Sequence, residues 1–333
     1  MAVFIYFYKY CLFFKELGGF MEEIYYILNS YYEKRCKNLI FVNEVILSNN
    51  KSCKMYFLDT ALESECNNYK KLFQEYLPFY VQNRDKMKYY EINKESCDED
   101  ISSKLISYGK KLWNEDALFA TNDEKKLGIY SELFNDFYLN VVKEENILVT
   151  YSSKHAFSER NVRGIDVLGS KWENDNLTLI FSEAKFVESV YSASSSLVED
   201  IEGTEEKKGH VSEEYINRYM SFVVDQDHSF LSKAGNRKNM ERLIENINSK
   251  MFYGAKAINV FNELGINIRF VFFAIYSDNK FTPEERAVYY DRIVNSFNKE
   301  ILDTKIDTYE IEVVFIPIKN DSTVIKEAMT EWD

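Results

Sequence analysis

The stretch RGIDVLGSKWENDNLTLIFSEAKF, residues 163–186, decides the fold. It holds two runs rich in β-branched, aromatic and other apolar residues, and the polar run Glu173–Asn176 separates them. Apolar runs on either side of a turn-forming segment are typical of a β-hairpin. We therefore predict strands over Asn161–Ser170 and Leu177–Phe186, joined by a tight turn.

Charged residues interrupt both predicted strands: Asp166 lies in the first, and Glu183 and Lys185 lie in the second. Residues two apart on a strand point to the same face, so Glu183 and Lys185 share a face while Ala184 points into the opposite layer. If the turn is centred on the Asn-Asp pair of the polar run, Asp166 lies opposite Glu183. Their Cβ atoms would then be about 5 Å apart, close enough for both carboxylates to bind one divalent cation. A slip of one residue would place them on opposite faces.

Charges within a central strand are costly to bury unless they are paired or bind a metal. Lys185 supplies one positive charge against two carboxylates, so a bound Mg²⁺, or Mn²⁺ in its place, would balance the site. Such an ion polarises a phosphoryl oxygen and activates a water for in-line attack. We predict Asp166, Glu183 and the Ala184 carbonyl as metal ligands. Lys185 would orient the water or stabilise the charge that develops on the phosphoryl group.

An Asp on one strand followed by Glu-x-Lys on the next resembles the restriction-endonuclease-like nucleases, the PD-(D/E)xK superfamily. In that superfamily a preceding helix carries a further catalytic Glu. The matching helix is predicted here over Asn122–Val142, and its candidate is Glu132. Glu132 lies on the side of this helix that faces away from the apolar stripe. Two interpretations therefore stay open: Glu132 leans over the metal site, or it is a solvated surface residue.

Three segments resemble, more narrowly, HamA, the family of nuclease subunits of the Hachiman anti-phage defence system. They are Tyr130–Leu133, Arg163–Gly169 and Ser182–Phe186, the last followed by a Ser-rich segment. The resemblance covers roughly residues 120–318. It implies Mg²⁺-dependent hydrolysis of DNA phosphodiesters. It also implies a helicase partner, HamB, that restrains the nuclease until foreign or damaged DNA engages the complex.

The order of predicted elements indicates an α/β fold with a restriction-endonuclease-like core, in which helices flank a mixed sheet. We divide the chain into an N-terminal α/β region, residues 1–120, with partner binding as one role for it, and a nuclease domain, residues 121–333. In the first region the sequence predicts strands near Asn38–Leu47 and Lys54–Leu58. It also predicts a helix over Ala61–Leu77 that stops before a proline. In the second, the acidic segment from Glu199 to Glu206 predicts an exposed loop.

The chain carries 41 Lys and Arg against 54 Asp and Glu, a net charge of −13. Residues 121–333 hold 25 basic and 37 acidic side chains, so 12 of the excess negative charges lie there. Proteins that grip nucleic acid over a broad surface carry a basic face. The charge therefore argues against a nuclease that acts alone and favours one to which a partner delivers DNA. The basic cluster Lys154, Arg160 and Arg163 is the candidate for contact with the DNA backbone.

Further features of the sequence limit the possible chemistry and the cellular location that we expect. No P-loop is present, so any ATP would be consumed by the partner. The three histidines share no metal-ligand spacing, and the five cysteines form no zinc pattern. The apolar N-terminal run is interrupted by Lys9 and is too short for a membrane span, so we expect a cytoplasmic protein. Translation could begin at Met1 or at Met21.

Two other functions fit the same residues. The chain could be a non-catalytic regulatory or DNA-binding subunit that keeps the fold and docks on a helicase. It could also be a repair or recombination nuclease unconnected with phage, which would share the site and differ in its partners. The sequence leaves open whether the substrate is single- or double-stranded and whether cleavage is endo- or exonucleolytic.

Overall fold

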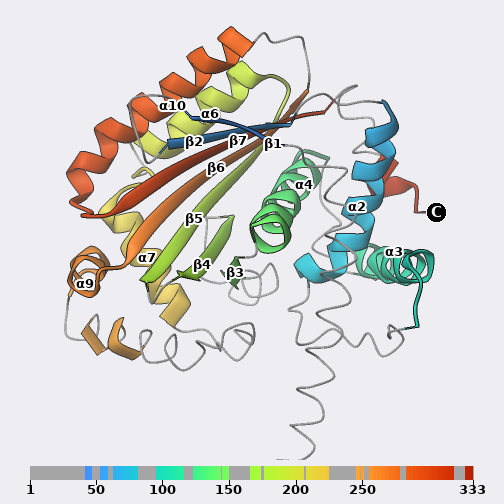
Figure 1. Cartoon of the computed structure of the whole chain (residues 1–333), viewed down its shortest axis with the longest axis horizontal. Coiled ribbons are helices and arrows are strands. Elements are labelled where there is room, and N and C mark those ends of the chain that lie inside the picture. Colours follow the sequence, from blue (N-terminus) through green and yellow to red (C-terminus); the bar gives the residue numbers. More distant parts are fainter. Residues whose placement is uncertain are drawn as a thin grey trace, which may run out of the picture.

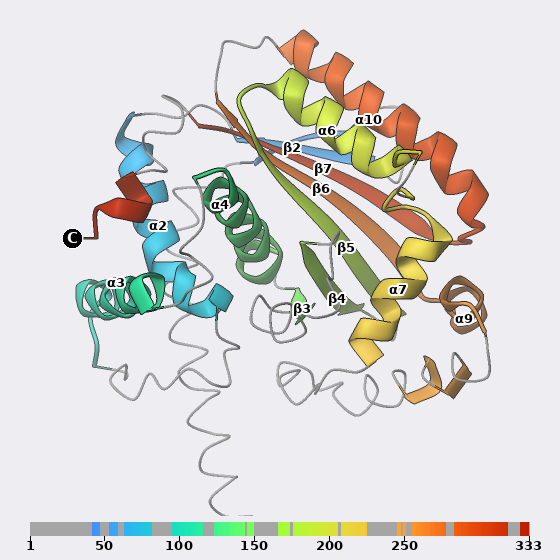
Figure 2. The same ribbon diagram turned by 180° about the vertical axis from the view of Figure 1, so that it is seen from behind.

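The computed structural model confirms the α/β class, with a mixed sheet flanked by helices on both faces (Figures 1 and 2). It describes residues 42–46, 53–58, 63–81, 95–115, 123–143, 145–149, 166–173, 176–205, 208–224, 245–247, 249–250, 255–277, 283–318 and 327–332. None of the helices in these stretches is long and apolar enough to cross a membrane.

Seven strands form a single sheet within the described residues, in the order β1-β2-β7-β6-β5-β4-β3. The strands are β1 (Val42–Ile46), β2 (Cys53–Leu58), β3 (Asn146–Val149), β4 (Val167–Glu173), β5 (Asn176–Val187), β6 (Asn267–Ser277) and β7 (Tyr309–Ile318). The four central strands β2, β7, β6 and β5 run parallel, whereas β1, β4 and β3 pair antiparallel with their neighbours. Parallel strands need crossovers, and α10 supplies the one between β6 and β7.

Helices cover each face of this sheet (Figures 1 and 2). They are α2 (Glu63–Val81), α3 (Asp98–Glu115), α4 (Asp123–Phe137), the π-helical turn η3 (Tyr138–Val142), α6 (Val190–Glu202), α7 (Glu213–Val224), α9 (Ala257–Leu264) and α10 (Pro283–Thr304). Helix α4 packs on one face, with α2 and α3 beyond it, and α6, α7, α9 and α10 lie on the other. The predicted helix over Asn122–Val142 is confirmed as α4 together with η3.

The hairpin of β4 and β5 has the predicted register. Val167 pairs with Ser182, and Glu173 pairs with Asn176. The backbone N–H of Asp166 donates to the Ser182 carbonyl at 3.2 Å. Ser182 is also the partner of Val167, so the regular register ends there and does not extend to the predicted pair of Asp166 and Glu183.

Alternate side chains of β5 enter two different cores. Ile180 and Ala184 belong to the core on the α4 side, whereas Leu179 and Phe181 belong to the core on the α6 side. Ala184 therefore points into the layer opposite to the one that Glu183 faces, as predicted. The Ser182 hydroxyl donates to Asn135 Oδ1 of α4 at 2.9 Å and so ties β5 to that helix.

Two local predictions were wrong. Helix α2 does not stop before Pro78 but continues to Val81, because every side chain from Leu72 to Val81 is buried and this packing outweighs the hydrogen bond that the proline removes. The predicted acidic loop begins as helix: α6 extends to Glu202, because its apolar stripe continues to Ile201 against the sheet.

The predicted division at residue 120 does not separate two sheets. Strand β2, from the first region, pairs in parallel with β7, from the second, with Cys53 opposite Ile311 and Phe57 opposite Phe315. Helices α2 and α3 also share one hydrophobic core with α4 and with the sheet. The described parts of the N-terminal region thus complete the sheet and one of its two layers.

Gly109 lets α3 approach α2 closely, and this predicts a contrast between two helical glycines. A Cβ at Gly109 would lie 2.5 Å from the Gln74 carbonyl oxygen, whereas a Cβ at Gly128 of α4 would meet nothing within 4 Å. Gly109→Ala should therefore destabilise the protein by about 1–3 kcal/mol through overpacking. Gly128→Ala should stabilise it by about 0.5–1 kcal/mol, because alanine favours helix. Chemical denaturation measures both, and equal effects of the two variants would contradict this packing.

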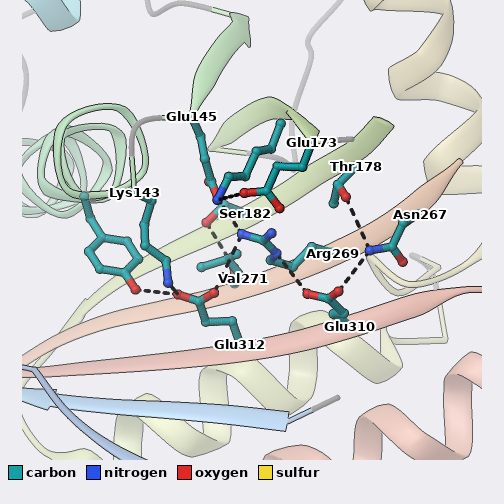
Figure 3. Close-up of polar contacts among 12 residues, drawn as sticks. Lys143, Glu145, Glu173, Thr178, Ser182, Asn267, Arg269, Val271, Glu310 and Glu312 are labelled. Atoms are coloured by element: carbon teal, nitrogen blue, oxygen red, sulfur yellow. Dashed lines mark hydrogen bonds and ion pairs between the residues drawn. The ribbon is translucent and has the colours of Figure 1, made fainter. Parts of the chain in front are cut away.

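A buried ionic network links η3, β3, β6 and β7 on the face that α4 covers (Figure 3). Arg269 of β6 pairs with Glu145 through Nη1 and with Glu310 through Nε at 3.3 Å, and its Nη1 lies 4.0 Å from Glu312. Lys143 Nζ lies 3.4 Å from Glu312. Three carboxylates thus share two cations. Burial raises the pKa of the fully buried Glu145 to about 7, although Arg269 opposes that rise.

This pKa predicts a pH-dependent difference in stability between the native protein and Glu145→Gln. The folded-state pKa of about 7 lies above the ordinary 4.5, so the stability that Glu145 contributes is complete below pH 4.5 and is lost as pH rises through 7. The native protein should lose on the order of 2–3 kcal/mol relative to the variant between pH 4.5 and 8. Urea denaturation of both proteins across this range measures the difference. Glu173→Gln, at an exposed carboxylate, is the control and should show no such trend.

Candidate active site on β5 and α6

Glu183 and Lys185 lie on one face of β5, and α6 brings Asp200 against them. Lys185 Nζ lies 3.0 Å from Glu183 Oε1 and 2.6 Å from Asp200 Oδ2. Glu183 is only 6% exposed, whereas Lys185 and Asp200 are half-buried. The helix can deliver Asp200 there because its apolar side chains Ala193, Leu197 and Ile201 pack on the sheet.

His210 closes this group from the segment that follows α6. Its Nδ1 lies 3.2 Å from Glu183 Oε2, and its Nε2 lies 4.0 Å from Asp200 Oδ1. The imidazole is buried and stacks on the Tyr215 ring, with 4.1 Å between the ring centroids. Donor atoms of Glu183, Asp200 and His210 all lie within 4.8 Å of one another, which makes this trio a candidate metal-binding group among the described residues.

Asp166 directly precedes β4 and reaches β5 through its side chain. Its Oδ2 accepts the backbone N–H of Ala184 at 2.7 Å. This bond holds the Asp166 carboxylate beside the segment Glu183–Lys185, where the metal ligands were predicted. The negative charge of Asp166 also acts on Lys185.

The predicted helical residue Glu132 takes an intermediate position. It is half-buried, and its Oε2 accepts a hydrogen bond from the Tyr80 hydroxyl at 2.7 Å. It is therefore not a fully solvated surface residue, yet it does not belong to the group formed by Glu183, Asp200 and His210. Its charge still contributes to the raised pKa of Glu183.

Burial sets the protonation of the two central groups. It raises the pKa of Glu183 to about 8; Lys185 opposes this rise, and the charges of Asp200 and Glu132 add to it. Burial by itself would lower the pKa of Lys185, but the carboxylates of Glu183, Asp200 and Asp166 raise it above its usual value. Lys185 therefore stays an ammonium ion at neutral pH and cannot act as a general base.

Glu183 offers an atom that fits a cation. Its Oε2 is buried and accepts no hydrogen bond within the described residues, and its contact with His210 Nδ1 lacks hydrogen-bond geometry. A buried carboxylate oxygen without a donor is costly, and a divalent cation would satisfy it. The Asp166 carboxylate binds the backbone N–H of Ala184, the residue that follows Glu183. The predicted Mg²⁺ ligands Asp166, Glu183 and Ala184 are therefore compatible with this arrangement.

The structure thus brings Asp166, Glu183, Ala184 and Lys185 together, and it adds two residues that sequence reasoning missed. Asp200 and His210 have no telling spacing relative to Glu183, because they reach it from a helix and from the segment beyond that helix. One signal could have found Asp200: it follows Leu197 by three residues and so borders the buried stripe of α6. The predicted DNA-contacting residues Lys154, Arg160 and Arg163 lie outside the described residues.

Comparison with known proteins identifies the family. A model of the HamA family matches residues 34–331. The chain belongs to the HamA family. The HamA match covers both the strands that carry Asp166 and Glu183 and much of the first 120 residues, and membership indicates a component of the Hachiman defence system. A search of curated proteins found no match.

Proposed function

We propose that this HamA-family chain is a Mg²⁺-dependent DNA nuclease of the PD-(D/E)xK type, restrained and delivered to DNA by a helicase partner. The observation that carries the proposal is the buried Glu183 carboxylate, which lies beside Lys185 on β5, next to the Ala184 N–H that Asp166 accepts, and has one oxygen that accepts no hydrogen bond within the described residues. Buried carboxylates paired with a lysine at a strand end suit metal-assisted phosphodiester hydrolysis.

The roles of the residues follow from their contacts. Asp166, Glu183 and the Ala184 carbonyl would hold Mg²⁺, which supplies Lewis-acid polarisation of the phosphoryl oxygen when bound. Lys185, which stays protonated, donates a hydrogen bond to the attacking water or to a phosphate oxygen and stabilises the charge that develops there. Asp200 holds the Lys185 ammonium through its 2.6 Å contact and so limits its freedom to rotate away. Glu132, held by Tyr80, adds negative charge beside the site.

The charge of the chain supports a partner in this function. A net charge of −13 disfavours binding to the DNA backbone, and such binding as occurs would weaken steeply with salt. A nuclease subunit with this charge would cut little DNA by itself, which suits a defence enzyme that must spare the host. A helicase that grips the DNA and presents a strand would supply the missing affinity.

The test is a cleavage assay on the chain alone and in complex with the helicase. Linear duplex, single-stranded and nicked DNA are each incubated with Mg²⁺ or with EDTA, and with ATP for the complex. We expect cleavage by the complex with Mg²⁺, none with EDTA, and little by the chain alone. If the complex binds and unwinds DNA but cuts no form of it with either Mg²⁺ or Mn²⁺, the non-catalytic role is correct and the nuclease proposal fails.

A further inference from the structure

The carboxylates of Glu183 and Asp200 make the same two kinds of contact. Each carboxylate directs one oxygen to Lys185, at 3.0 Å from Glu183 and 2.6 Å from Asp200. The second oxygen of each lies toward His210, at 3.2 Å and 4.0 Å. One donor atom from each of Glu183, Asp200 and His210 lies within 4.8 Å of the other two, close enough for all three to bind one cation.

The backbone fixes His210 in this position. Its N–H donates to the Asp200 carbonyl at 2.7 Å, which joins the segment after α6 to the end of that helix. The preceding Gly209 lies so close to α6 that a Cβ there would be 1.9 Å from the Ile201 carbonyl oxygen. The Tyr215 ring stacks on the imidazole from α7. Side chains held in place by packing and by backbone bonds are the arrangement that tight metal sites need.

We propose that Glu183, Asp200 and His210 bind a second divalent cation, distinct from the Mg²⁺ at Asp166 and the Ala184 carbonyl. Two carboxylate oxygens and one imidazole nitrogen favour first-row transition metals such as Mn²⁺, Co²⁺ and Zn²⁺, because imidazole suits these ions and Mg²⁺ prefers oxygen alone. When Glu183 and Asp200 are both ionised, their two negative charges exceed the single ammonium of Lys185, and a bound cation would balance the excess. The site shares Glu183 with the proposed nuclease centre, but its existence does not depend on DNA cleavage.

Metal binding to the full chain tests this site directly. Co²⁺ is titrated into the native protein, Asp200→Asn and His210→Gln, and binding is followed by visible absorption and by calorimetry. Each variant loses one protein ligand and should bind Co²⁺ at this site about tenfold more weakly or worse. Asp166→Asn keeps all three ligands and should retain this binding. Glu199→Gln removes an exposed carboxylate next to Asp200 on α6 and is the matched control.

A spectroscopic readout identifies the ligand even if a variant is unstable. Pulsed electron paramagnetic resonance of bound Mn²⁺ should show coupling to an imidazole nitrogen in the native protein and in Asp166→Asn, and none in His210→Gln. Gly209→Ala keeps every ligand but displaces His210, so it should weaken Co²⁺ binding as well. Native-like Co²⁺ affinity in His210→Gln, or the absence of nitrogen coupling in the native protein, would overturn the second site. Loss of Co²⁺ binding in Asp166→Asn alone would assign the ion to the nuclease centre instead.

Discussion

Lys185→Met should reduce Mg²⁺-dependent DNA cleavage by the helicase complex about 10²–10³-fold, the usual cost of losing a donor that stabilises transition-state charge. Methionine keeps most of the volume of lysine, and it removes the ammonium that contacts Glu183 and Asp200. Single-turnover cleavage of one defined DNA, with enzyme in excess, measures the chemical step. DNA binding by the complex should not change.

Lys171→Met is the matched control for this variant. Lys171 lies on β4, the strand next to β5, and pairs at 2.7 Å with the exposed Glu173 at the far end of the hairpin. Its replacement should leave cleavage within about twofold of the native rate, since exposed ion pairs contribute little. Equal activity of the two methionine variants would remove Lys185 from the proposed mechanism.

Arg269→Met should destabilise the protein by about 3–5 kcal/mol, the cost of leaving buried carboxylates without their cation. Arg269 pairs with the fully buried Glu145 and also faces Glu310 and Glu312, so its loss leaves three carboxylates with Lys143 alone (Figure 3). Guanidinium chloride unfolding at pH 8 measures the change. At pH 5 the loss should be smaller, because Glu145 takes up a proton below its pKa of about 7.

Lys299→Met provides the comparison for Arg269. Lys299 lies on α10, pairs with the neighbouring Glu300 at 3.0 Å and is largely exposed. Its loss should leave the free energy of unfolding nearly unchanged, because exposed ion pairs contribute little. A similarly small effect for Arg269→Met at pH 8 would mean that the network on the α4 face does not stabilise the fold.

Local sequence pattern predicted the hairpin and its register. The apolar run Leu177–Phe186, the polar turn and the interrupting charges together predicted the register of the hairpin, and the pairing of Val167 with Ser182 agrees. These features depend on residues close in the chain, so their signal is contained in short windows.

Features that depend on distant residues could not be predicted in the same way. The pairing of β2 with β7 joins residues more than 250 positions apart, and nothing in either strand specifies the other. Burial of α2 carries the helix past Pro78 against its local propensity. Asp200 and His210 reach Glu183 only because α6 folds back on the sheet and Gly209 permits the close return of the chain. Local sequence pattern thus predicts Asp166, Glu183 and Lys185 of the candidate site, whereas tertiary packing adds Asp200 and His210.

The central claim is that Asp166 and Glu183 form a metal-dependent nuclease centre. The most direct test measures the dependence of the single-turnover cleavage rate on Mg²⁺ concentration for the native helicase complex and for complexes that carry Asp166→Asn or Glu183→Gln. Both substitutions preserve shape and remove a metal ligand. We predict that the native rate rises with Mg²⁺ to a plateau, and that neither variant reaches one per cent of that plateau at any Mg²⁺ concentration, in keeping with the roughly 10²-fold or greater loss expected when a charge-stabilising group is removed. Folded variants that reach the native plateau would contradict the account.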